Sequence, residues 1–451
     1  MIETTKRIGG NRADRRRRAV ALLLIAGAAA GCDAIFEVDN PNDLVQEDLE
    51  QPTSSTALVN GAEATVARGL NDVVLAISVP SDELTWRGTY DAGRELDAGF
   101  LSNPANEFSN AEAWSTFNEG RFMADEAVRL MEGWDAEGVL PDPSHLARAY
   151  LYSGIMYVAA ADYWDSFVIS NRREAAPPIP ETEMWQLYDV AIERLGNGLA
   201  IARALEDAEL EATILGMRAR AHFSKAVWQK LNPGGSTPAE PLVDDAAAAA
   251  DATAALALVE PDWKYQFTYG PTTISSQLGG WINSRQEFRV DTLYGVPNDA
   301  GSRITAVALL DPIDGVPDPA LERVLTEFGA FSATTELYPP FTVVSARELH
   351  LIAAEVALAG GNDADAALHI NAVRTLDGLT EYSGQLPLLD LLIHERRVNL
   401  FLQGRRLADM YRFGITDTRW QPTSDAASNP GTFFPIADQE IKSNCYVSGT
   451  C

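Results

Sequence analysis

The sequence predicts a mostly α-helical fold, in which helical hairpins of the tetratricopeptide type build a superhelical scaffold. Three observations predict it. Apolar residues recur at helical spacing through most of the chain. A small-and-large alternation that lets paired helices pack closely begins at Ala147, again at Ala219 and more loosely at Ala346. Helical patterns fade only over residues 260–340, where aromatic residues interleave with Gly, Pro, Ser and Thr, so an irregular, loop-rich insertion carrying short strands is expected there.

Composition and charge narrow the class of partner. The chain has 451 residues, 46% of them hydrophobic and 22% charged, which is typical of a folded protein with a substantial core. Its formal net charge is −29. The first 32 residues hold seven basic and two acidic side chains, so the remainder has 28 basic and 62 acidic residues and a net charge of −34. This charge argues against nucleic acid or anionic lipid head groups as partners and favours neutral or cationic ligands.

The N-terminus has the features of an export signal. A basic region ends at Arg18, and residues 19–30 form an apolar stretch too short to span a bilayer. Small residues then precede Cys32, an arrangement that resembles a bacterial lipobox and implies that residues 1–31 are a lipoprotein signal peptide and that Cys32 is lipidated. The alternative is ordinary signal cleavage nearby, which would leave Cys32 free.

The two remaining cysteines, Cys445 and Cys451, lie close together at the C-terminus. In an exported chain such a pair predicts a disulfide that closes a short tail loop. Two free thiols on a disordered end are the alternative. A zinc site is not expected, because neither cysteine has a histidine or another cysteine at ligand spacing.

The periodicity places the helices in order. An acidic arm punctuated by Pro and Asn follows Cys32, and residues 84–100 are short and mixed after a turn signal at 81–83. Apolar stripes predict helices over residues 56–75, 113–134, 145–163, 183–205, 211–231, 244–259 and 363–376, with a further one beginning near residue 346.

Residues 388–414 are predicted to form one charged helix near the C-terminus. Arg405 and Asp409 are four residues apart, and Arg406 and Asp409 three, so either pair could meet on one helix face. Gly404 would cost about 1 kcal/mol in a helix interior, which suggests that another backbone approaches closely there. Together these features indicate a structural keystone and not a catalytic loop.

Motifs for common chemistries are absent from the sequence. His394-Glu395 begins like a zinc-protease motif, but the position four residues after His394 is Val398. There is no P-loop, no G-x-S-x-G elbow and no glycine-rich dinucleotide turn after a strand. The five histidines fall mostly within helical patterns. We therefore predict no catalytic residues, no metal site and no cofactor.

The segment 388–414 resembles the C-terminal signature of the SusD/RagB family. The matching positions are Glu395, Arg396, Gly404, Arg406, Asp409, Arg412 and Gly414, whereas Asn399 and Gln403 replace two acidic residues usual in the family. Residues 348–355 and 370–375 are similar to two upstream family segments. Residues 434–444 are similar to its closing segment, with Ala437 where proline is usual.

The resemblance implies a single SusD-like domain over residues 32–451. It would comprise an N-terminal arm (33–55), a helical scaffold (56–259 and 341–420), a variable ligand-side insertion (260–340) and a C-terminal tail (421–451). It also implies a lipid-anchored protein on the cell surface of the outer membrane, which captures a nutrient, usually a glycan, and passes it to a SusC-type TonB-dependent transporter. Catalysis is not expected, and the signature charges would then be packing-locked ion pairs.

Glycan sites in the family lie on loops after an early helix and in the variable middle region. The corresponding residues here, which could stack on sugars or bond their hydroxyls, are Trp86, Tyr90, Trp263, Trp281, Asn283 and Tyr294. Trp114, Trp185 and Trp228 lie on helical stripes and are expected in the core. Two other functions stay open: the same fold could bind peptides or another nutrient, or the chain could be a secreted helical-repeat scaffold that docks proteins. A hydrolase is a further alternative.

Overall fold

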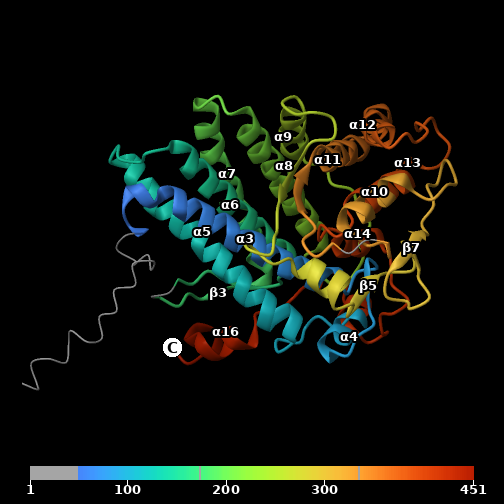
Figure 1. Ribbon diagram of the computed structural model, residues 1–451, viewed down its shortest axis with the longest axis horizontal. Coiled ribbons are helices and arrows are strands. Elements are labelled where there is room, and N and C mark those ends of the chain that lie inside the picture. Colours follow the sequence, from blue (N-terminus) through green and yellow to red (C-terminus); the bar gives the residue numbers. More distant parts are fainter. Residues whose placement is uncertain (1–48, 172–173, 334–335) are drawn as a thin grey trace, which may run out of the picture. The chain divides into compact units, whose positions relative to one another are not determined.

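Helical hairpins dominate the computed structural model, which describes residues 49–171, 174–333 and 336–451 (Figure 1). Residues from Pro52 to Cys451 form one compact unit. The predicted signal peptide, Cys32 and most of the predicted arm lie outside the described residues. Among the residues that are described, no helix is both long and apolar enough to cross a bilayer.

The scaffold helices pack in sequence order, each against the next. They are α3 (Ser55–Ser78), α5 (Ala113–Ala136), α6 (Pro143–Tyr163), α7 (Trp185–Ala204), α8 (Ala208–Leu231), α9 (Ala246–Leu256), α11 (Ala346–Ala359) and α12 (Asp363–Leu376). α9 contacts α11 directly. The helices therefore pack in an unbroken series, although residues 260–340 separate α9 from α11 in the sequence. Short connections join α7 to α8 and α11 to α12 as antiparallel hairpins (Figure 1). The predicted mostly helical scaffold is confirmed.

Side-chain caps fix where many of these helices begin. The carboxylates of Asp142, Asp207 and Asp245 each accept a backbone N–H at the start of α6, α8 and α9. Asn362 does the same for α12. Each such cap stabilises its helix by about 1 kcal/mol, because it pairs an amide that has no partner within the helix.

Two glycines let α3 and α5 approach closely. A Cβ on Gly69 would lie 2.9 Å from the Phe117 Cα, and a Cβ on Gly120 would lie 2.8 Å from the Thr65 carbonyl oxygen. Both distances are too short for carbon in van der Waals contact, so larger residues at either position would separate the two helices.

The insertion contributes short strands to three antiparallel pairs, as predicted, and two of these pairs take their second strand from outside residues 260–340. Strand β1 (Leu84–Trp86) pairs with β5 (Phe288–Val290), β4 (Lys264–Phe267) with β8 (Phe341–Ser345), and β6 (Gly295–Pro297) with β7 (Ile304–Val307). A fourth pair, β2 (Phe167–Val168) with β3 (Pro178–Ile179), lies outside the insertion. The insertion also holds a helix that the sequence pattern did not predict, α10 (Pro319–Phe328), capped by Asp318 and ended by Gly329.

The predicted single helix over residues 388–414 is wrong. The chain forms α13 (Leu388–Asn399) and α14 (Arg406–Phe413) with a break between them, where Leu402 and Gly404 have φ values of +56° and +75°. Gly404 is therefore a turn residue and not a helix-interior residue. The close neighbour is the Tyr163 side chain and not a backbone, since a Cβ on Gly404 would meet the Tyr163 hydroxyl.

The charges of this segment bind other parts of the chain. Arg406 donates to both oxygens of Asp82 at 2.7 Å, and Arg405 donates to Asp162 at 3.2 Å, so neither makes the predicted pair with Asp409. Asp409 instead accepts hydrogen bonds from Arg396 and Arg412, both at 2.9 Å. All of these signature side chains are largely or fully buried.

Two further ion pairs complete this buried network. Arg412 pairs with Glu355 of α11, and Glu395 accepts from Arg374 of α12 at 2.6 Å. Burial opposes the charge of Asp409, but Arg396 and Arg412 hold the pKa of its carboxyl below the usual value. The network therefore ties α13 and α14 to the scaffold.

The C-terminal tail ends in α15 (Asp425–Ser428), α16 (Asp438–Ser443) and α17 (Cys445–Ser448). Cys445 and Cys451 are joined by a disulfide, with their Cα atoms 4.8 Å apart. The tail is tied to the rest by Asn444, whose amide donates to the Ala176 carbonyl at 2.9 Å, and by the Phe434 amide, which donates to the Tyr163 carbonyl at 3.0 Å.

Candidate functional site

Four aromatic side chains from separate segments meet beside a cleft. Tyr90 precedes α4 (Asp91–Asp97), Phe108 lies in the π-helix η2 (Glu107–Glu112), Trp281 in the π-helix η4 (Gly279–Ser284), and Phe288 begins β5. The Phe108 and Trp281 ring centroids are 4.7 Å apart, and those of Tyr90 and Trp281 are 5.4 Å apart, both edge to face. Tyr90 is 37% exposed, whereas Trp281 is only 4% exposed.

The β1–β5 pair positions Tyr90. Trp86 ends β1 opposite Phe288, and the amides of Arg87 and Gly88 both donate to the Glu287 carbonyl, at 2.9 and 3.1 Å. The Glu287 carboxylate then accepts the Thr89 amide at 2.7 Å. These bonds turn the chain directly after β1, so Tyr90 stands at the N-terminus of α4.

Arg285 covers the Trp281 indole. Its Cζ lies 3.7 Å from the Trp281 ring centroid and 5.2 Å from that of Tyr90, and its Nη2 donates to the Tyr90 hydroxyl at 3.0 Å. The guanidinium is exposed and makes no ion pair within 4 Å among the described residues. The aromatic surface open to a ligand is therefore that of Tyr90, and the planar guanidinium extends it.

A cleft of about 730 Å³ adjoins Tyr90. Ligand sites commonly occupy roughly 300–1,000 Å³, whereas the cavity beneath α8, between Tyr188 and Arg405, holds only about 40 Å³. The cleft is formed by α4 and the residues just before it, by the segment that leads into η2, and by the C-terminal tail. Its lining residues are Thr89, Tyr90, Asp91, Ala92, Arg94, Glu95, Ala98, Phe100, Asn103, Ala105, Asn106, Glu107 and Gln421.

Amide and carboxylate groups in the cleft are held in place by one another. Asn103 donates to both oxygens of Glu95, at 3.1 and 2.9 Å. Asn106 donates to Glu95 at 2.9 Å and to the Ala92 carbonyl at 3.0 Å, while its own oxygen caps η2 by accepting the Phe108 amide. Asn106 is only 2% exposed, so it holds Glu95 and η2 in place and does not itself face a ligand. Glu95 and Asn103 are half-buried and are fixed before any ligand arrives, which lowers the entropic cost of binding.

The cleft thus offers an exposed aromatic face, a planar amide and several carboxylates. An aromatic face stacks on the C–H surface of a sugar ring, while amides and carboxylates bond its hydroxyls. Asp91 is paired with Arg94 at 2.9 Å, and Glu107 is exposed at the rim. Charges of both signs line the cleft, which suits a neutral polar ligand.

The structure brings only part of the predicted site together. Tyr90 and Trp281 meet, and Trp86 lies half-buried beneath Gly93 next to Phe288. Trp263 lies elsewhere: it precedes β4, and its carbonyl accepts the Ala346 amide at 2.8 Å. It therefore belongs to the β4–β8 pair and not to the cleft.

Asn283 and Tyr294 are buried, which corrects their predicted role in stacking or hydroxyl binding. The Asn283 amide donates to the Phe328 carbonyl at 2.8 Å and to that of Glu336 at 2.9 Å. The Tyr294 hydroxyl donates to Asp82 at 2.6 Å, and the ring is fully buried under Arg397. Neither side chain has a face left for a sugar ring.

Sequence reasoning missed Arg285, Glu95, Asn103 and Asn106. Arg285 lies only two residues beyond Asn283, but no pattern marks it as the cover of an indole. Asn103 and Asn106 flank Pro104 and Ala105, a typical turn signal, and their convergence on Glu95 could not be read from spacing.

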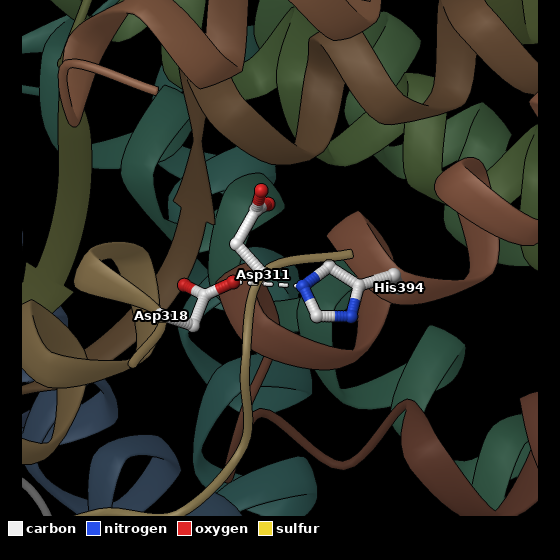
Figure 2. Close-up of side chains that lie close together, drawn as sticks. All are labelled: Asp311, Asp318 and His394. Carbon is white, nitrogen blue, oxygen red and sulfur yellow. Dashed lines mark hydrogen bonds and ion pairs between the residues drawn. The ribbon is translucent and has the colours of Figure 1, made fainter. Parts of the chain in front are cut away.

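One group of described residues, Asp311, Asp318 and His394, has ligand atoms close enough to share a metal ion (Figure 2). Its oxygens already have partners. Asp311 accepts two hydrogen bonds from Arg374, at 2.7 and 3.1 Å, and Asp318 caps α10 and accepts from His394 at 2.7 Å. Because Arg374 already places a positive charge against Asp311, we assign this group a structural role.

The chain is similar to known proteins in one family segment and in its fold. Residues 347–444 match the model of the SusD family, and no curated protein sequence matches the chain. Among solved structures, a SusD-like carbohydrate binding protein from Bacteroides vulgatus is similar over 89% of this chain and 98% of its own, with a TM-score of 0.58 and 12% identity.

Two structures from Bacteroides thetaiotaomicron are similar to the same extent. A SusD homolog covers 88% of this chain and 97% of its own, with a TM-score of 0.60 and 12% identity. Surface glycan-binding protein A covers 88% and 98%, with a TM-score of 0.56 and 13% identity. At these identities the likeness establishes the fold, which is that of the SusD-like proteins. The family match over residues 347–444 and this shared fold together support the SusD/RagB family for the chain.

Proposed function

We propose that the chain is a cell-surface binding protein that captures an oligosaccharide in the cleft beside Tyr90. The observation that carries the proposal is the exposed Tyr90 ring at the wall of a cleft of about 730 Å³, with Asn103, Asn106 and Glu95 already ordered around it. Family membership supports it, as do similar structures described as carbohydrate- and glycan-binding.

An oligosaccharide array and a peptide library, both probed with the purified full chain, test this proposal. We expect retention of one class of glycan, with affinity that depends little on salt, because a neutral ligand makes few ionic contacts. Retention of basic peptides alone, weakening as salt rises, would contradict it. Binding of basic peptides is the second candidate function. The cleft carboxylates of Asp91, Glu95 and Glu107 and the strongly acidic chain favour it.

Transfer to a SusC-type TonB-dependent transporter in the outer membrane is the second part of the proposal. It rests on the family, on the signal-like residues 1–31 and on the lipobox-like Cys32. Affinity purification from membranes of the native host tests it, and we expect a large barrel protein in stoichiometric amount. A chain that purifies alone, or with soluble proteins only, would favour the docking-scaffold alternative.

Binding without catalysis is the third part of the proposal. Glu95, the carboxylate best placed in the cleft, accepts hydrogen bonds on both oxygens, and Asp91 is paired with Arg94. Neither is presented as a proton donor to a glycosidic oxygen. Incubation with a fluorescently labelled form of the retained glycan should leave it intact, and shortened products would show a hydrolase.

A further inference from the structure

Two histidines from neighbouring helices meet on the hairpin of α11 and α12. The Nδ1 atoms of His350 and His369 are 3.0 Å apart, and their ring centroids are 5.3 Å apart. Both side chains are half-buried, so solvent ions can reach them. One ring must donate its Nδ1 proton to the other, because two protonated Nδ1 atoms would repel at this distance.

The surroundings keep these imidazoles uncharged at neutral pH. Burial, together with the neighbouring His369, lowers the pKa of His350 to about 4. Burial also lowers the pKa of His369, against the opposing charge of Asp365. The neutral imidazole is the form that binds metal ions, so the pair needs no loss of charge before it can act as a ligand.

From this geometry we propose that His350 and His369 form a binding site for a divalent transition metal ion of the zinc and nickel class. Two imidazole nitrogens bound at about 2.0–2.1 Å to one ion lie roughly 3.0–3.4 Å apart, and the observed separation falls in that range. On binding, the Nδ1 proton of the donor ring moves through solvent to its own Nε2. Both rings stay neutral, and both Nδ1 lone pairs bind the ion.

Asp365 adds a negative charge on the same face, although its carboxylate does not lie within ligand distance of both rings. It lies four residues before His369 on α12, which places both side chains one turn apart, and it is half-buried. Its charge already acts on His369. The two imidazoles therefore supply the protein ligands, and water molecules complete the coordination of the ion. The bound ion would clamp α11 to α12 and is independent of the glycan cleft.

Isothermal titration calorimetry of the full chain with nickel or zinc chloride tests the site. The protein carries no polyhistidine tag, and its Cys32 thiol, if free, is alkylated beforehand. We expect one ion per chain in the micromolar range, weakened at least about tenfold by His350→Ala or His369→Ala and by about threefold in Asp365→Asn. His394→Gln, which alters the Asp311 group, should leave the affinity unchanged.

Thermal unfolding provides a second readout, because an ion that binds only the folded chain raises the melting temperature. Zinc should raise it for the parent chain and for His394→Gln but not for His369→Ala. Asp365→Asn leaves the contact between the two rings intact and so controls for loss of folding. Absence of binding at about 100 µM metal, or loss of binding in His394→Gln alone, would overturn the site.

Discussion

Arg285 determines which aromatic surface a ligand meets. Its guanidinium lies 3.7 Å from the Trp281 ring centroid, so the indole is covered and Tyr90 carries the open face. The same guanidinium donates to the Tyr90 hydroxyl and so fixes the orientation of that ring. If the proposed function is correct, Arg285 acts on ligand binding through Tyr90.

The substitution Arg285→Ala should weaken glycan binding about fivefold, roughly 1 kcal/mol, because Tyr90 loses its hydrogen bond and its stacked neighbour. Lys225→Ala is the matched control. Lys225 lies 5.3 Å over the Trp185 ring on the scaffold, much as Arg285 lies over Tyr90, but neither Lys225 nor Trp185 lines the cleft. Calorimetry with the retained glycan would contradict this role if both variants bound like the parent.

Glu83 makes stability depend on pH. Burial raises the pKa of its carboxyl from 4.5 to about 7, helped by the charge of Asp82 and opposed by the Leu402 amide. The folded chain therefore holds a proton that the unfolded chain has lost, and stability falls as pH rises from about 4.5 through 7. Glu83→Gln should remove this pH-dependent loss of unfolding free energy, which amounts to at most about 3 kcal/mol.

Urea unfolding at about pH 5 and pH 8 checks the Glu83 effect. The difference in unfolding free energy between the two pH values should be smaller in Glu83→Gln than in the parent chain. Substitution of the exposed Glu322 by Gln should leave the difference as it is. Parallel behaviour of Glu83→Gln and the parent would contradict the assignment.

At the scale of elements, the break between α13 and α14 depends on Gly404. Its φ is +75°, and a Cβ would meet the Tyr163 ring and hydroxyl. Gly404→Leu should therefore destabilise the fold by roughly 3 kcal/mol or more while altering ligand selectivity little.

Gly361 provides a matched control for Gly404. Its φ is +73°, and a Cβ there would meet nothing within 4 Å. Gly361→Leu should cost only about 1–2 kcal/mol, the cost of the left-handed backbone alone. Equal urea midpoints for the two variants would show that contact with Tyr163 contributes nothing.

Asp409 holds α13 and α14 together through Arg396 and Arg412. Asp409→Asn keeps the shape but leaves two buried guanidiniums short of a carboxylate, which should cost about 3–5 kcal/mol. Asp438→Asn breaks an exposed pair with Lys442 and should cost less than about 0.5 kcal/mol. Similar losses in chemical denaturation would refute a keystone role for the buried network.

The long helices could be predicted from sequence because their apolar stripes are strong and their starts carry Asp or Asn caps. The break at residues 400–405 could not, because apolar residues at Leu400 and Leu407 continue the helical spacing across it. Helix α10 has a readable signal, Asp318-Pro319 at its start and Gly329 at its end, which the surrounding irregular sequence obscures.

At the scale of the whole molecule, the site depends on contacts between distant segments. Sequence reasoning named Tyr90 and Trp281 separately, but only the β1–β5 pair brings them together. Another long-range contact explains why Tyr294 is not part of the site. Its hydroxyl donates to Asp82, in the segment before β1, and the ring is buried. An aromatic residue in a loop can be named from sequence as a candidate for ligand binding. Whether its side chain is buried depends on contacts with distant segments, which sequence spacing does not reveal.

The family signature is also a whole-molecule feature. Its charged residues link α13 and α14 to α11, α12 and the segment before β1, and the candidate cleft lies apart from them. These residues stabilise the scaffold and do not line the cleft. The match to the family model therefore bears on the architecture of this chain and not on the particular ligand.

The central claim, that the cleft beside Tyr90 binds glycan, is tested most directly by comparing two aromatic substitutions. Tyr90 and Trp185 are each 37% exposed, and each has a cation stacked on its ring, but only Tyr90 lines the cleft. Titration with the retained glycan should show at least about a tenfold loss of affinity in Tyr90→Ala and less than about a twofold change in Trp185→Ala. Equal affinities in the two variants, or a larger loss in Trp185→Ala, would contradict the account.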